Sequence, residues 1–230
     1  MGGTAVLATA PVSEEKPAGP RTLKGERTRA RLLEAAKAVF EEDGFLDARI
    51  SDISKRAGLS HGSFYHYFES KDEIFREVAL AVEEKLSTPV GSVILDQSSH
   101  ATPRERIRAA IRQHLESYRE EARIMGVIEQ MSRYDAQLNA ALSERHQHYN
   151  KQVADSIRQL QRRGLADRNL DPMLAAAVVG SMTNRFPELL LIQGFVDCSF
   201  EEGVEHLASV FINALQIRDE PESPSPARES

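Results

Sequence analysis

The strongest constraint on the fold of this chain is a pair of short helical segments joined by a glycine turn. Residues 51–57 carry apolar positions at helical spacing, and Gly58 can supply the positive φ that a tight turn needs. Ser60 can cap a second segment, residues 61–68, which is only two turns long and unusually aromatic. This combination predicts a helix-turn-helix, in which the second helix enters the major groove of DNA.

The rest of the chain is also predicted to be helical. Apolar residues recur at helical spacing, and capping residues, prolines and glycines bound the periodic stretches. Thr102, Pro103 and Glu105 combine an N-cap, a proline at the first helical position and a capping-box glutamate. Besides the two short segments, the predicted helices span residues 25–43, 70–88, 102–118, 124–131, 136–163, 171–194 and 201–217. No convincing strand occurs in the sequence, so the predicted fold class is all-α.

Composition divides the chain into two folded regions with a tail at each end. Residues 1–22 and 219–230 mix proline with small and polar residues and lack periodicity, so we expect disordered tails. Residues 23–70 are expected to form a three-helix helix-turn-helix domain, and residues 71–218 a larger helical domain. Of the 230 residues, 41% are hydrophobic, which is enough for a substantial core.

Charge is distributed unevenly between these regions. The stretch from Arg21 to Lys71 holds ten Lys and Arg against eight Asp and Glu, whereas the whole chain has a net charge of -6. Residues 21–31 hold five basic residues and one acidic residue. A basic segment beside a helix-turn-helix is typical of contact with phosphate or the minor groove, although a solvated charge run is the ordinary alternative. Arg27 is the best single candidate for such a contact.

Several other classes of protein are excluded. Cys198 is the one cysteine, so the chain can form neither an internal disulfide nor a multi-thiolate zinc site. It has no neighbouring histidine, and no Gly-x-Ser-x-Gly elbow occurs, so we expect no enzyme. His146 and His148 point about 200° apart on a helix, so they cannot share a metal ion as i, i+4 pairs do. We therefore expect no metal and no cofactor.

The most apolar stretch, residues 173–196, is not expected to cross a membrane. Arg185, Pro187 and Glu188 interrupt it, and each is poorly tolerated at the centre of a lipid-facing helix. No charged start followed by an apolar stretch resembles an export signal. We expect a cytoplasmic protein without a membrane partner.

The segment from residue 61 to residue 71 has the two faces that DNA recognition requires. Phe64 and Phe68 are expected to be core, while the opposite face offers hydrogen-bond donors to phosphates and bases. Gly62 permits close approach of the backbone to phosphate. The candidate donors are His61, Ser63, Tyr65, His66, Tyr67 and Lys71.

These residues resemble a known family. Residues 57–75, AGLSHGSFYHYFESKDEIF, are similar nearly position for position to the signature of the TetR family of transcriptional regulators, and the resemblance extends from about Arg27 to Leu86. It implies a three-helix DNA-binding head, a connecting helix, a helical ligand-binding body and a homodimer held by the last two helices.

The resemblance also implies roles for single residues. Ser63, Tyr67 and Lys71 fall on positions that contact phosphate, and Tyr65 on one that reaches phosphate or a thymine methyl; His61 occupies a variable position. Ala48 and Arg49 depart from the pattern, because the family usually has two threonines there, one of which caps the next helix. Arginine cannot cap that helix but binds phosphate strongly, so we expect Arg49 to keep the contact.

The body carries a weaker signal for a ligand cavity. Flexible methionines and aromatic residues recur on its helices and can line a cavity, with plain core as the alternative. The candidates are Tyr118, Met125, Ile128, Met131, Tyr149, Met182 and Phe186. Arg185 interrupts an apolar helix and needs an anion, which is either an internal carboxylate such as Glu188 or a ligand such as an acyl-CoA.

Together these features predict a TetR-like repressor that binds a pseudo-palindromic DNA operator as a homodimer and is released by a small apolar or acyl-CoA-like effector. Small residues at 175–177 and Gly180 are expected to permit close approach of the paired helices. Two alternatives stay open. One is a regulator of the same fold that activates transcription or responds to a protein partner; the other is a helical interaction or catalytic protein that no longer reads DNA.

Overall fold

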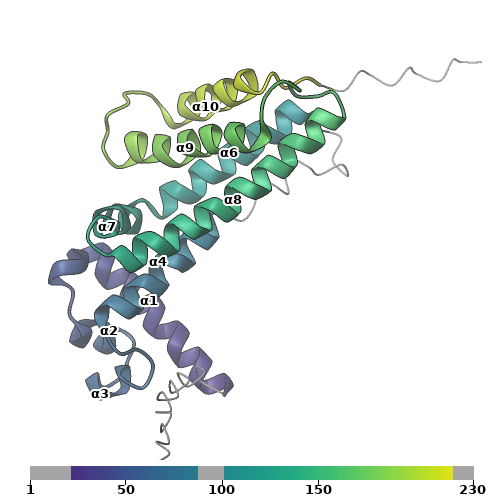
Figure 1. Cartoon of the computed structure of the whole chain (residues 1–230). Coiled ribbons are helices and arrows are strands. Elements are labelled where there is room, and N and C mark those ends of the chain that lie inside the picture. The colour runs from purple at the N-terminus through teal and green to yellow at the C-terminus, as the bar shows by residue number, and fades with distance from the viewer. Residues whose placement is uncertain (1–21, 88–100, 220–230) are drawn as a thin grey trace, which may run out of the picture.

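The computed structural model describes residues 22–87 and 101–219, and within these ranges every regular element is a helix (Figure 1). The prediction of an all-α fold is confirmed. The helices are α1 (Leu23–Asp47), α2 (Ile50–Arg56), α3 (His61–Phe64), α4 (Lys71–Ser87), α6 (Pro103–Glu120), α7 (Ala122–Ser132), α8 (Ala136–Arg162), α9 (Pro172–Leu191) and α10 (Phe200–Ala214). Of the two predicted tails, only Thr22 and Asp219 lie within the described residues.

Local signals in the sequence account for the ends of several helices. The Thr102 hydroxyl accepts a hydrogen bond from the Glu105 backbone, and the Glu105 carboxylate accepts one from the Thr102 backbone, so the predicted capping box forms. α1 begins earlier than expected because the Thr22 side chain caps it. Gly44, the residue after the predicted helix end at residue 43, departs from helical geometry with a φ of 72°, but one further turn of α1 follows it.

The aromatic segment predicted as a two-turn helix is helical only over His61–Phe64. Beyond it the Tyr67 N–H donates to the Phe64 carbonyl and the His66 N–H to the Ser63 carbonyl, which is the tighter three-residue spacing of a turn. The turn brings the rings of Phe64 and Phe68, which are 0% and 1% exposed, into one core. The prediction of a helix over residues 65–68 is therefore wrong, whereas the prediction that both phenylalanines are core is confirmed.

The molecule has two hydrophobic cores. The first core contains residues of α1, α2, α3, α4 and α7 and of the start of α8. It includes Phe40, Phe64, Phe75 and Ile128. The second joins α6, the end of α8, α9 and α10. We call residues 22–70 the head and the remaining described residues the body. Because α4 and α7 share the first core with the head, packing is continuous across residue 70.

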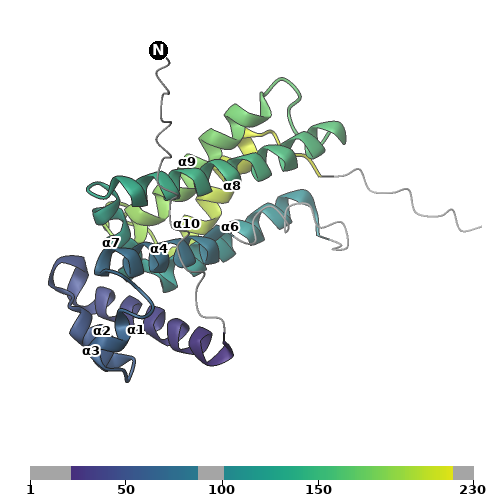
Figure 2. The same ribbon diagram turned by 60° about the horizontal axis from the view of Figure 1, so that its bottom comes forward.

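The two ends of the molecule are occupied by different helices (Figures 1 and 2). α2 and α3 lie at one end, α9 and α10 lie at the other, and α4 leads from the head into the body. None of the helices in the described ranges has the length and apolar character needed to cross a bilayer.

The small residues of α9 do not all lie where the sequence suggested. Ala176 and Gly180 are buried within the chain, and a Cβ at Gly180 would lie 2.5 Å from the Asn150 side-chain oxygen on α8. Gly180 therefore serves close packing of α9 on α8 of the same chain, and the expectation that it faces a partner is wrong.

Candidate nucleic-acid interface and body pocket

The end of the head presents the predicted donors to solvent. His61, Gly62 and His66 are exposed, Tyr65 is 51% exposed, and Ser63 and Tyr67 are half-buried. The Ser60 hydroxyl accepts a hydrogen bond from the Ser63 N–H and lies 2.7 Å from the Ser63 hydroxyl, which fixes the first turn of α3. With both phenylalanines turned inward, the segment has one apolar and one polar face, as DNA recognition requires.

Arg49 stands at the N-cap of α2 and makes no side-chain capping hydrogen bond. The expectation that arginine cannot cap this helix is confirmed. Its side chain is exposed, so the guanidinium is accessible to a phosphate, and that contact stays a prediction.

Lys71 has a structural role that the sequence did not reveal. Its ammonium group donates to the carbonyls of Phe45 at 2.6 Å and Ala48 at 2.8 Å, and lies over the Phe45 ring. These contacts close the C-terminal end of α1, where carbonyls lack helical partners. The predicted phosphate contact stays a prediction, and it requires the ammonium group to leave these carbonyls.

The basic segment is divided between internal and exposed side chains. Arg29 forms an ion pair with Glu77 of α4, and Arg31 donates to the Ala57 carbonyl at the end of α2. Lys24 and Arg27 are exposed, whereas Arg21 lies outside the described residues. Arg27 therefore remains available for DNA, while two of its neighbours brace the head.

A buried carboxylate joins the head to the body. Glu121, 5% exposed at the start of α7, lies 2.5 Å from the Lys37 ammonium of α1 and 2.9 Å from the Lys85 ammonium of α4. Burial alone would raise the pKa of Glu121, but the hydrogen bonds from Lys37 and Lys85 outweigh it and lower that pKa. Glu121 thus joins the start of α7 to both α1 and α4.

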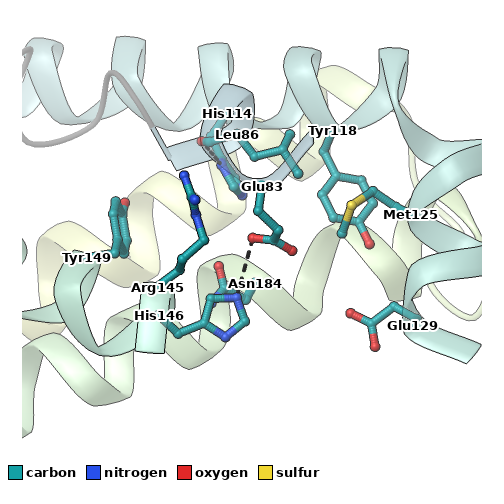
Figure 3. Close-up of a pocket in the computed structure, with 10 residues that line it drawn as sticks. All are labelled: Glu83, Leu86, His114, Tyr118, Met125, Glu129, Arg145, His146, Tyr149 and Asn184. Carbon is teal, nitrogen blue, oxygen red and sulfur yellow. Dashed lines mark hydrogen bonds and ion pairs between the residues drawn. The ribbon is translucent and has the colours of Figure 1, made fainter. Parts of the chain in front are cut away.

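A pocket lies in the body where five helices meet (Figure 3). Its volume is about 50 Å³, which gives room for a few water molecules. The residues that line it are Glu83, Leu86, His114, Tyr118, Met125, Glu129, Arg145, His146, Tyr149 and Asn184.

Three of the eight predicted ligand residues, Tyr118, Met125 and Tyr149, line this pocket. The other five do not. Ile128 and Met131 belong to or pack against the first core, and Met182 and Phe186 pack against the second. Arg185 forms an ion pair with Glu188, so the internal carboxylate is the alternative that holds.

Histidines hold part of the pocket wall. The ring nitrogens of His114 lie 3.3 Å from the Leu86 carbonyl and 3.2 Å from the Thr183 carbonyl, which ties α6 to α4 and α9. Burial lowers the pKa of His114 and so favours the neutral ring, which has one N–H and can donate to only one of these two carbonyls at a time. His146 pairs with Glu83 at 3.4 Å, and this hydrogen bond raises the pKa of His146.

The sequence interpretation missed the acidic residues of the pocket. Glu83 lies one position from the apolar stripe of α4, where nothing singles it out. Glu129 is the one charged residue in the apolar run from Ile124 to Met131, and that interruption was a usable signal. Burial, followed by the charges of Glu188 and Glu83, raises the pKa of Glu129.

Known proteins share these features. The family model for bacterial regulatory proteins of the tetR family matches residues 32–78, and the model for the tetracyclin repressor-like C-terminal domain matches residues 100–188. The uncharacterized HTH-type transcriptional regulator YdgC of Bacillus subtilis (strain 168) is 41% identical over 73 residues, which cover 32% of this chain. The match spans only 37% of YdgC.

Solved structures cover more of the chain. A TetR-family transcriptional regulator from Mesorhizobium loti MAFF303099 has a TM-score of 0.71 at 22% identity and covers 83% of this chain and 96% of its own. A transcriptional regulator from Saccharomonospora viridis, solved in complex with choline, has a TM-score of 0.68 at 22% identity and covers 85% of this chain and 100% of its own. At this identity the likeness establishes the fold.

The family models match both the DNA-reading head and the helical body, and the relatives are transcriptional regulators and not enzymes. The chain therefore belongs to the TetR family and is a helix-turn-helix transcriptional regulator.

Proposed function

We propose that the protein is a repressor that binds a pseudo-palindromic operator as a homodimer and leaves it when a small molecule enters the body pocket. The observation that carries the proposal is the two-faced segment around α3, with phenylalanines in the core and Tyr65 and its polar neighbours outside. This segment stands at the end of the molecule opposite α9 and α10 (Figure 1).

Exposed apolar side chains on the last two helices support the homodimer. Leu174 and Val178, one turn apart on α9, are 70% and 60% exposed, and Val210 of α10 is 51% exposed. Leu174 and Val178 lie four residues apart and so share one face of α9, and exposed apolar side chains on a shared face are typical of a subunit interface. A twofold axis through this face would present two α3 segments, so half-sites should lie about 34–36 Å apart or a multiple of that distance.

The pocket supports a small-molecule effector over control by a protein partner, since a regulator of the second kind needs no cavity. α4 contributes Glu83 and Leu86 to the wall and packs against the head in the first core, so a ligand that widens the pocket would displace α4. Only a ligand that prefers the displaced state can lower DNA affinity. The Saccharomonospora viridis regulator, which shares this fold, was solved in complex with the small molecule choline, and this supports the proposal.

The operator test uses DNA from upstream of the protein's own gene. Footprinting should reveal two protected half-sites, and a reporter gene should be silenced by the protein. Tyr65→Ala should weaken operator binding by about tenfold or more, because a base or phosphate contact is lost. Tyr134→Ala, which removes a tyrosine that is 81% exposed on the body, is the matched control. Equal operator affinity of the two variants would contradict the proposal.

A further inference from the structure

We propose that the body pocket takes an organic cation, an amine or quaternary ammonium ion that carries an apolar group, with its positive charge beside Glu129 and Glu83. The inference rests on the proposed role of this pocket as the effector site and names the chemical class of the effector.

The charges around the pocket do not balance. The cationic side chains in its wall already have acidic partners, since His146 pairs with Glu83 and Arg145 pairs with Glu84. The Glu129 carboxylate has no ion pair or hydrogen bond with any of the described residues. In Figure 3 it lies at the edge of the pocket away from Arg145 and His146. One carboxylate is thus left for a cation from outside the chain.

The energetics of Glu129 favour a positive ligand. Burial disfavours its charged form, and the charges of Glu188 and Glu83 add to this penalty, which together raise its pKa. Arg133 and Arg185 oppose the shift only through weaker charge interactions, and Arg185 is already paired with Glu188. A cation bound beside Glu129 would relieve the penalty, whereas an anion would increase it.

Tyr118 gives an independent sign of a missing ligand. Its side chain is 2% exposed, and its buried hydroxyl has no hydrogen-bond partner among residues 22–87 and 101–219. Leaving such a group unpaired in a protein interior is unfavourable, so the hydroxyl is available to a polar partner that enters the pocket. The rings of Tyr118 and Tyr149 also line the space, and aromatic faces attract cations.

The remaining wall suits the apolar part of such a ligand. Leu86 and Met125 contribute aliphatic surface, and methionine adapts to ligands of different shape. The expectation of an acyl-CoA or other anionic lipid depended on a free Arg185, and the ion pair with Glu188 removes that reason. The pocket must widen from about 50 Å³ to admit a quaternary ammonium ion of the size of choline, which connects occupancy to the position of α4.

The test compares probes of matched shape on the full chain. Choline is compared with neutral 3,3-dimethylbutan-1-ol, and decyltrimethylammonium is compared with the anion decanoate; binding is measured by titration calorimetry without DNA. We expect each cation to bind at least about tenfold more tightly than its partner. Glu129→Gln should weaken cation binding by about tenfold or more, whereas Asp155→Asn, which removes an exposed carboxylate of α8 outside the pocket, should leave it unchanged.

Three results would overturn the inference: binding of neither cation, equal binding of a neutral or anionic probe, or unchanged cation binding by Glu129→Gln. Circular dichroism of each variant shows whether it folds, and the comparison of probes on the unmodified protein does not depend on any variant. Operator binding is measured separately. If the protein binds the cations but does not bind operator DNA, the proposed function is refuted and the inferred ligand class is supported.

Discussion

The head and the body differ in how far apart in the sequence their functional residues lie. In the head, the polar face that is proposed to meet DNA is built from residues 61–67 together with Arg27 and Arg49. In the body, the pocket draws its wall from α4, α6, α7, α8 and α9, between residues 83 and 184. A surface made by one turn of chain is visible in a sequence pattern, whereas a cavity among five helices depends on how those helices pack.

The largest expected effect tests whether the head is energetically separate from the body. Phe64→Ala should lower the free energy of unfolding by about 3–5 kcal/mol, because removal of the buried Phe64 ring leaves a cavity in the first core. Urea unfolding followed by circular dichroism measures the loss. Leu46→Ala, at a head position that is 75% exposed, should have almost no effect.

The shape of that transition sharpens the comparison. Since α4 and α7 share the first core with the head, we expect one cooperative transition in the Phe64→Ala protein. Two transitions, with the head melting first, would mean that the continuous packing does not couple the two regions.

The next effect concerns the end of the body opposite the head. Leu174→Asp should weaken dimer formation by about 30-fold or more, equivalent to ~2 kcal/mol, because a carboxylate would be buried in an apolar interface. Sedimentation at several concentrations measures the dimer. Leu23→Asp, at a position of the head that is 75% exposed, serves as the control. A dimer that withstands Leu174→Asp would place the interface elsewhere.

A smaller effect is expected at the ion pairs that join the two regions. Glu121→Gln should cost about 1.5 kcal/mol of stability at pH 7, the low end for charged hydrogen bonds, because Lys37 and Lys85 are partly exposed. The folded pKa of Glu121 is lowered, so its contribution is present above the ordinary value of 4.5 and is lost as the pH falls through the folded pKa. Wild type and variant should therefore converge in stability in acid, as unfolding at several pH values would measure. A difference that persists there would argue against these ion pairs.

The smallest effect separates exposed from internal arginines of the basic segment. Arg27→Ala should weaken binding to all DNA sequences about equally and flatten the slope of log affinity against log salt by about 0.9, the value for one phosphate contact. Arg29→Ala should instead lower stability and leave the slope unchanged, because Arg29 pairs with Glu77. Fluorescence anisotropy across a salt series tests both variants. Identical slopes for Arg27→Ala and wild type would remove Arg27 from the interface.

Particular residues show where prediction from sequence stops. Helix existence followed from periodicity and capping, and the capping box at Thr102 and Glu105 formed as predicted. Lys71 and Arg29 were counted as charge available to DNA or solvent, yet they bind carbonyls at the end of α1 and a carboxylate of α4. A count of charged residues cannot distinguish side chains with internal partners from free cations, because long side chains reach partners many residues away in the sequence.

The sequence alone determined the all-helical class, the helix-turn-helix and the residues on its polar face, because hydrogen bonds within each helix and side-chain periodicity are local. The tertiary structure decided which acidic residues face the pocket, which cations are neutralised and which face of α9 stays apolar and exposed. Burial and Coulomb interactions depend on distance in space, and residues such as Glu83, Glu129 and His146 approach one another only after the helices have packed.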